Sequence, residues 1–142
     1  MEKQKILFVC VENSCRSQMA EGFARALGAD TIEVYSAGSY PLGKVNPDAV
    51  KVMCESGIDI ASQRSKGFQE LPITTFDYVV TLGCQDVCPL VPARKNIDWD
   101  IDDPKGKSIY FFRCVRDKIE QKVKLLLRSV VSSEAANSTT LN

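Results

Sequence analysis

The chain has 142 residues, among them 18 lysines and arginines, 18 aspartates and glutamates and no histidine, so its formal net charge is zero. This length fits one domain with a single hydrophobic core, and the balanced charge argues against a nucleic-acid or membrane surface. No apolar run approaches the roughly 20 residues of a membrane span, and the first run is too short for a signal peptide. We therefore expect a cytoplasmic monomer with no nucleic-acid or membrane partner, whose six cysteines serve chemistry or metal binding rather than a disulfide scaffold.

The predicted elements alternate between strand and helix. Residues 6–10 form a continuous apolar run that is typical of a parallel strand buried on both faces. The next predicted elements, in chain order, are a helix over 17–27 that ends at Gly28, a strand over 31–36, a helix that begins at Pro47 and ends before Gly57, a strand over 76–82 and a short strand over 97–99.

The last predicted element is a long amphipathic helix that begins near Ser108. Residues 132–142 are small, polar and aperiodic, and we expect a disordered tail there, after a single domain over residues 1–131. The alternation predicts an α/β fold with an open, four-stranded parallel sheet flanked by helices, which binds ligands at the carboxyl ends of its strands. The apolar residues of the last helix recur every three or four positions: Phe112, Val115, Ile119, Val123, Leu126 and Val130.

A Cys-x5-Arg loop follows the first strand, with Cys10 at the strand end and Arg16 at the start of the next helix. Backbone N–H groups that curl into a helix N-terminus bind anions, and a guanidinium group suits two oxygens at once. The loop therefore predicts a nucleophilic sulfur beside an oxyanion site, in positive surroundings that favour the thiolate. The structural alternative is a buried thiol that ends a strand, beside a solvated arginine. The predicted oxyanion-binding residues are Val11, Glu12, Asn13, Ser14, Cys15, Arg16 and Ser17.

The segment from Val9 to Gly22 resembles the phosphate loop and first helix of arsenate reductases that have the low-molecular-weight tyrosine phosphatase fold. Its core, Asn13-Ser14-Cys15-Arg16-Ser17-Gln18-Met19-Ala20-Glu21, is far more specific than the Cys-x5-Arg spacing alone. The resemblance covers roughly residues 5–130 and implies this fold and the conversion of arsenate to arsenite. It continues through Ser36-Ala37-Gly38, Gly57-Ile58-Asp59-Ile60, Val79-Val80-Thr81-Leu82 and Trp99-Asp100-Ile101-Asp102-Asp103-Pro104.

Asp103 precedes Pro104 in the last of these segments. Loss of an oxygen from a tetrahedral oxyanion requires a proton on the leaving group, which a carboxylic acid can donate. The resemblance implies that Asp103 is this general acid, rather than its neighbour Asp102. The structural alternative is a turn, completed by the lysine and glycine that follow the proline.

Two further cysteines, Cys84 and Cys88, follow the strand predicted over 76–82, at the sheet edge that also carries Cys10. The resemblance implies that Cys10 attacks arsenate, that Cys84 attacks Cys10 and expels arsenite, and that Cys88 resolves the resulting disulfide to Cys84–Cys88. The implied reductant is an external dithiol, thioredoxin, and no other cofactor is expected. The Cys84-x3-Cys88 spacing is shorter than in thioredoxin-coupled members, so glutaredoxin or a small thiol stays an alternative.

Three other functions compete with the reductase. A phosphatase would use the same loop and acid, but its family usually carries a tyrosine after Asp-Pro, where this chain has Lys105. A non-catalytic redox sensor or oxyanion-binding module would use the same disulfide. A zinc site would have to add Cys54 and Cys114, which we expect to be small core or boundary residues instead.

Some family members bind potassium beneath the loop, at positions that match Asn13, Glu21 and Ser36. Where those members have an acidic ligand, this chain has Lys66. We therefore expect the Lys66 ammonium to stand in for the cation, and the activity not to depend on potassium.

Overall fold

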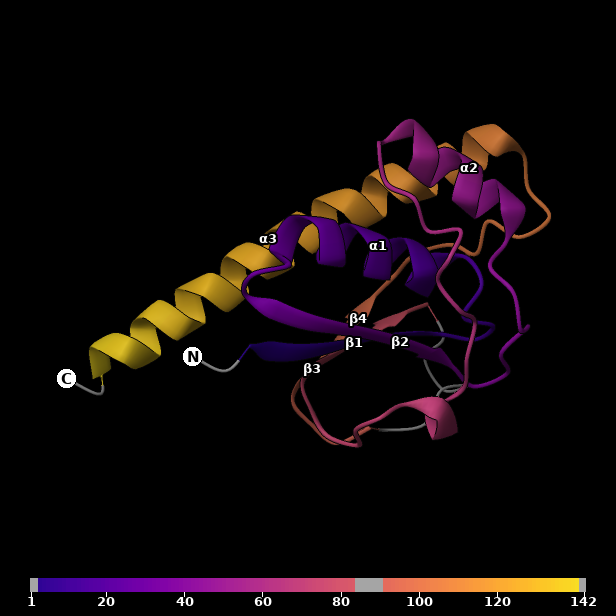
Figure 1. The fold of residues 1–142 in the computed structure, drawn as a ribbon. Helices are drawn as coiled ribbons and strands as arrows, with labels where there is room; N and C mark the ends of the chain where they lie inside the picture. The colour runs from indigo at the N-terminus through magenta and orange to yellow at the C-terminus, as the bar shows by residue number, and fades with distance from the viewer. Residues whose placement is uncertain (1–2, 84–90, 141–142) are drawn as a thin grey trace.

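The computed structural model describes residues 3–83 and 91–140, with the side chains of the last helix up to residue 131. The predicted α/β fold is confirmed, and every predicted strand and helix is present (Figure 1). In chain order the elements are β1 (Gln4–Cys10), α1 (Arg16–Gly28), β2 (Ile32–Gly38), α2 (Pro47–Glu55), the short 3-10 helix η1 (Phe68–Glu70), β3 (Phe76–Leu82), β4 (Ala93–Trp99) and α3 (Ile109–Thr140).

The four strands in the described part of the chain form one parallel sheet in the order β2-β1-β3-β4. Strand β1 lies in its interior, where Cys10 is paired with Gly38 of β2, and Val9 with Thr81 of β3. Because the strands are parallel, their carboxyl ends meet at one edge of the sheet, which is where such sheets bind ligands.

Different elements cover the two faces of the sheet. Figure 1 shows α1, α2 and α3 over one face and η1 beyond the other. Ile6 and Phe8 of β1 pack into the core that contains the helices, whereas Leu7 and Val9 belong to a smaller core with the segment around η1. Successive side chains of a strand point to opposite faces, so the continuous apolar run of β1 follows from burial on both.

Helix α3 is longer than the sequence pattern predicts. Its six predicted apolar residues, from Phe112 to Val130, are all buried. The helix then continues to Thr140, so the expected disordered tail is wrong for residues 132–140. The chain there contains no glycine or proline to end the helix, and a helix that is already formed extends at little cost. Among the described residues, no helix has the length and apolar character needed to cross a membrane.

Strand β4 is also longer than the predicted 97–99. It forms the edge of the sheet and pairs with β3. Its residues 94–96 are polar and exposed, as is typical of an edge strand, so the apolar pattern reveals only its end.

Candidate active site

The predicted oxyanion loop lies at the carboxyl end of β1 and leads directly into α1, which begins at Arg16. Gly38 of β2 comes so close to the loop that a β-carbon there would lie 2.5 Å from the carbonyl oxygen of Val11. That oxygen also accepts a hydrogen bond from the N–H of Tyr40, at 2.8 Å. Ser14 is buried and donates its hydroxyl to the carbonyl oxygen of Lys44, at 3.0 Å. The loop is thus held by hydrogen bonds to the segment that follows β2.

Ser17 places two polar groups against the sulfur of Cys10. Its N–H donates to Sγ at 3.4 Å, and its Oγ lies 2.9 Å from Sγ. Nδ2 of Asn13 donates to the same Oγ at 2.7 Å, which leaves the hydroxyl proton of Ser17 free to point at the sulfur. Donors aimed at the sulfur stabilise negative charge there, and the thiolate is the form that attacks an electrophile.

Asn13 adopts a left-handed backbone conformation, with φ of 49°. Asparagine is one of the few residues that visit this region routinely. Its Oδ1 accepts hydrogen bonds from the N–H of Lys66 and from Nε2 of Gln18, each at 2.9 Å. These bonds orient the amide so that Nδ2 faces Ser17.

Arg16 is buried, with 6% of its surface exposed. Nη1 donates to the carbonyl oxygen of Ile101 at 3.0 Å, and Nη2 lies 3.7 Å from Oδ2 of Asp103. Within the described part of the chain, Nε has no hydrogen-bond partner. A buried donor without a partner is costly, and an anion bound beside the guanidinium group would supply the missing acceptor.

Asp103 lies at the mouth of the same pocket, with half of its side chain exposed. Its Oδ1 accepts the N–H of Lys105 at 3.0 Å, and the N–H of Lys107 bonds to the carbonyl oxygen of Pro104 at 2.8 Å. Asp103 therefore belongs to a turn and also faces Arg16, so the turn and the acid role are compatible. The pocket is lined by Cys10, Glu12, Ser14, Cys15, Arg16 and Asp103.

Cys15 shares the loop with Cys10 but is a different kind of thiol. Burial, with smaller contributions from Asp103 and Cys10, raises the pKa of Cys15 from 9.0 to about 12. Cys15 therefore stays protonated at neutral pH and is a poor nucleophile.

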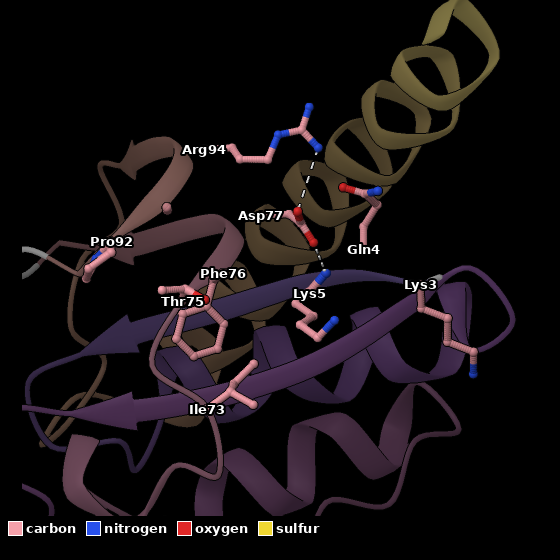
Figure 2. A pocket seen from close by; sticks show the side chains of 10 residues that line it. Lys3, Gln4, Lys5, Ile73, Thr75, Phe76, Asp77, Pro92 and Arg94 are labelled. Atoms are coloured by element: carbon pink, nitrogen blue, oxygen red, sulfur yellow. Dashed lines mark hydrogen bonds and ion pairs between the residues drawn. The ribbon is translucent and has the colours of Figure 1, made fainter. Parts of the chain in front are cut away.

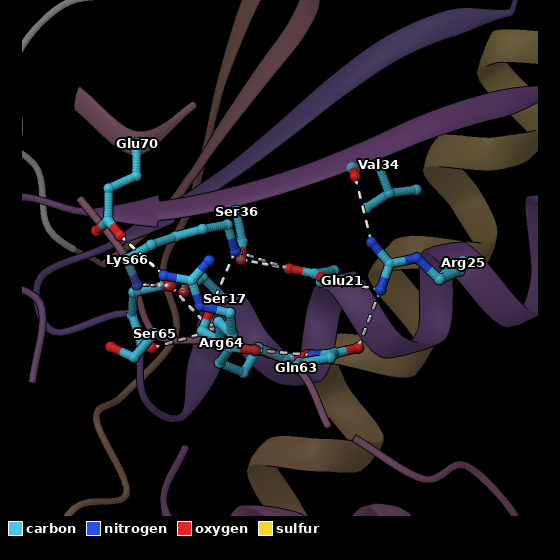
Figure 3. A network of polar contacts seen from close by, with 12 residues as sticks. Ser17, Glu21, Arg25, Val34, Ser36, Gln63, Arg64, Ser65, Lys66 and Glu70 are labelled. Atoms are coloured by element: carbon cyan, nitrogen blue, oxygen red, sulfur yellow. Dashed lines mark hydrogen bonds and ion pairs between the residues drawn. The ribbon is translucent and has the colours of Figure 1, made fainter. Parts of the chain in front are cut away.

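Beneath the loop, Lys66 joins a buried polar network (Figure 3). Its Nζ donates to Oγ of Ser36 at 3.2 Å and lies 3.6 Å from Oε1 of Glu21. Ser36 donates to Glu21, whose other oxygen lies 2.7 Å from Nη1 of Arg25. Two cations thus compensate the buried carboxylate, which would otherwise be expensive to bury.

The second pair of predicted redox residues, Cys84 and Cys88, lies outside the described residues. Gly83 is the last residue described before them, and it packs against the site. A β-carbon at Gly83 would lie 2.5 Å from Nη1 of Arg16. The chain thus enters the segment of Cys84 directly beside the guanidinium group.

The prediction that Cys54 and Cys114 are core or boundary residues is wrong, because both are exposed. Cys54 lies one position past the buried Met53 on α2, and Cys114 faces solvent between the buried Phe112 and Val115 on α3. A helix has about 3.6 residues per turn, so neighbours of a buried position need not be buried. Among the described residues, no group of three or more metal-ligating side chains gathers.

A larger cavity, of about 590 Å³, lies away from this site, at the amino ends of β1, β3 and β4 (Figure 2). Its carboxylate, Asp77, already accepts the N–H of Lys5 at 2.7 Å and lies 3.7 Å from Nη1 of Arg94. No cysteine lines it, so it does not compete with the loop as the candidate active site.

Three contacts of the site are not predicted from the sequence. They are the Gln18 amide that orients Asn13, the Gly83 contact with Arg16, and an ion pair between Glu12 and Lys105, with Nζ 2.8 Å from Oε2. Only the last had a signal in the sequence, because an acidic residue inside an oxyanion loop calls for a compensating cation.

A parallel sheet with a cysteine, a buried arginine and an aspartate around one small pocket is typical of the class of cysteine enzymes that act on tetrahedral oxyanions. The chain belongs to the family of low molecular weight phosphotyrosine protein phosphatases, which matches residues 5–136.

The relatives found by comparison carry a narrower description. A "Glutaredoxin arsenate reductase" from Synechocystis is 41% identical over 130 residues, which are 89% of this chain and 98% of the relative. A solved structure described as "An arsenate reductase in the phosphate binding state" is 40% identical with a TM-score of 0.81, over 89% of this chain and 98% of the other. A thioredoxin-dependent arsenate reductase from Corynebacterium glutamicum is 29% identical with a TM-score of 0.75, over 92% and 63% of the two chains.

Proposed function

We propose that this protein is an arsenate reductase, which converts arsenate to arsenite with Cys10 as the nucleophile. The observation that carries the proposal is the pocket that Cys10, Arg16 and Asp103 line together, with a buried Nε of Arg16 that has no partner in the described chain. A tetrahedral oxyanion would satisfy this donor. The names of the relatives support arsenate as that oxyanion.

In the first step, the thiolate of Cys10 attacks arsenic and one arsenate oxygen leaves as water. Asp103 donates the proton that this oxygen needs, and water at the exposed mouth of the pocket returns it. Arg16 and the loop hold the remaining oxygens. The product is a covalent adduct in which arsenic(V) is bonded to the sulfur of Cys10.

In the second step, the thiolate of Cys84 attacks the sulfur of Cys10. A Cys10–Cys84 bond forms, the sulfur–arsenic bond breaks, and its electron pair stays on arsenic, which leaves as arsenite. Cys88 then attacks Cys84, which forms Cys84–Cys88 and frees Cys10. The contact between Gly83 and Arg16 supports this order, because Cys84 is the next residue in the chain.

Thioredoxin is the reductant that we propose for the Cys84–Cys88 disulfide, since it reduces exposed, labile disulfides. The thioredoxin-dependent relative supports it. The short Cys84-x3-Cys88 spacing and the name of the Synechocystis relative favour glutaredoxin as the second candidate. Turnover with each purified system, compared at equal concentration, distinguishes them. Both systems work in a reducing compartment, so we propose that the protein is cytoplasmic. We keep the monomer expected from the sequence as a separate proposal.

A phosphatase is the second candidate function, because the family name carries that activity. Lys105 stands after Pro104, and no aromatic side chain of the described residues lines the pocket. An aryl phosphate would therefore find nothing to stack on, which favours the reductase.

Disulfide mapping tests the proposal. The reduced protein is incubated with arsenate, or with phosphate as the control, quenched with acid and mapped by mass spectrometry. We expect a Cys84–Cys88 disulfide after incubation with arsenate but not with phosphate. In the Cys88→Ser variant, we expect the Cys10–Cys84 disulfide to accumulate. Arsenite formation that survives in Cys84→Ser, or hydrolysis of a phosphoester faster than arsenate turnover, would contradict the proposal.

A further inference from the structure

Glu12 places a carboxylate inside an oxyanion-binding loop. It lines the pocket together with Cys10, so its negative charge would repel an incoming oxyanion. Nζ of Lys105 donates to Oε2 of Glu12 at 2.8 Å. This hydrogen bond raises the pKa of Lys105 above its ordinary value, so the ammonium stays charged and compensates the carboxylate.

The same ion pair joins two walls of the pocket. Glu12 belongs to the loop after β1, and Lys105 lies 93 residues later, in the turn of Asp103. The N–H of Lys105 also donates to Oδ1 of Asp103, at 3.0 Å. The bridge therefore ties the position of the aspartate to the loop that carries Cys10.

The pocket between these walls is narrow. Its volume of about 10 Å³ is close to the space of one water molecule, and far below the roughly 300–1,000 Å³ of pockets that hold organic ligands. The lining residues are two cysteines, a serine, an arginine and two acids. The walls must part slightly for a bare oxyanion, and further for an ester whose organic group projects between them.

We propose that the Glu12–Lys105 ion pair is a specificity-determining bridge, which favours inorganic oxyanions over organic phosphoesters. The inference rests on the proposed function because it concerns the same site. Lys105 acts through Glu12 and Asp103, so it is a positioning residue rather than a catalytic one.

Ligand protection of Cys10 tests the bridge without any redox step. The rate of Cys10 alkylation by iodoacetamide is followed by peptide mass spectrometry, with phosphate or the non-hydrolysable phenylphosphonate as the protecting ligand. Neither ligand is reduced, so the assay does not depend on arsenate chemistry. The measured quantity is the ratio of the two dissociation constants.

Lys105→Ala is expected to lower the preference for phosphate over phenylphosphonate by about three- to fivefold, the range that a partly exposed ion pair supplies. Lys105→Arg keeps the ion pair and should keep the wild-type ratio. The matched control is Lys107→Ala in the same turn, whose Nζ lies 5.9 Å from the ring centroid of Phe111, and it should also keep the ratio.

An unchanged ratio in Lys105→Ala, or an equal shift in Lys105→Arg, overturns the bridge. Glu12→Gln provides a second variant, which should shift the ratio in the same direction as Lys105→Ala. If the variants shift the ratio as expected but the wild-type protein reduces no arsenate, the bridge is supported and the proposed function is overturned. An enzyme that reduces arsenate with a ratio insensitive to both variants overturns the bridge alone.

Discussion

The position of the Arg16 guanidinium group depends on the absence of a side chain at Gly83. Arg16 reaches the carbonyl oxygen of Ile101 with Nη1, and Gly83 covers that bond. A β-carbon at Gly83 would lie 2.5 Å from both Nη1 and this oxygen, and the φ of Gly83 is 76°. Gly83, the residue before Cys84, therefore contributes to the oxyanion site, because its lack of a side chain leaves room for the Arg16 guanidinium group.

Gly83→Ala should displace the guanidinium group and raise the KM for arsenate about tenfold, the size of one lost hydrogen bond to a charged group. The control is Gly57→Ala, because Gly57 has φ of 79° and open space around it. Both variants should lose roughly 1–2 kcal/mol of stability from the strained backbone. Gly83→Ala should lose more than the control, because its β-carbon also meets the carbonyl oxygen of Ile101. Steady-state kinetics in which both variants keep the wild-type KM would contradict the contact.

At the scale of elements, two arginines of α3 hold Glu55 at the end of α2. Arg113 donates from Nη2 to Oε2 and Arg116 from Nη1 to Oε1, each at 2.8 Å. The hydrogen bond from Arg113, followed by that from Arg116, lowers the pKa of Glu55 from 4.5 to about 2. A lowered folded-state pKa stabilises the protein above the unfolded pKa, and this contribution is lost as the pH falls toward the folded pKa.

Glu55→Gln should therefore reduce the free energy of unfolding above about pH 4.5, with a difference from wild type that shrinks as the pH falls toward 2. Urea unfolding at several pH values measures it. The control is Glu120→Gln on α3, where the carboxylate lies 3.2 Å from Nζ of Lys124, and it should show no comparable dependence. A difference between Glu55→Gln and wild type that is constant over this range would refute the link.

The Lys66 network also acts between elements, because it joins the segment after α2 to α1 and β2. Its ammonium already compensates Glu21, so a second cation at that place would meet like charge. We expect equal melting temperatures and equal activity in potassium and sodium chloride at matched ionic strength. A strong rise with potassium alone would show that the ammonium does not replace the ion.

At the scale of the whole molecule, burial along α3 is described as far as residue 131. The last buried residue of α3, among the side chains that the structure describes, is Val130. Residues 132–142 are mostly small and polar, so their removal should shift the melting temperature by less than about 2 °C, below the shift of a 1 kcal/mol loss in a domain of this size. A larger fall in a thermal melt would place part of the core beyond residue 131.

The strands, the helices and the Cys10–Arg16 loop follow from local pattern, since each is encoded within one continuous segment. The contacts that complete the site do not. Arg16 meets Ile101 across 85 residues, and Glu12 meets Lys105 across 93. The family resemblance assigned Asp103 its role, but no pattern within one segment reveals which side chains the sheet brings together.

The central claim is that three cysteines transfer two electrons to arsenate. The most direct measurement counts arsenite after the fully reduced protein meets excess arsenate with no external reductant. The account predicts one arsenite per chain, the loss of two thiols, and then no further reaction until thioredoxin is added. Absence of arsenite, or continued turnover without a reductant, would contradict it.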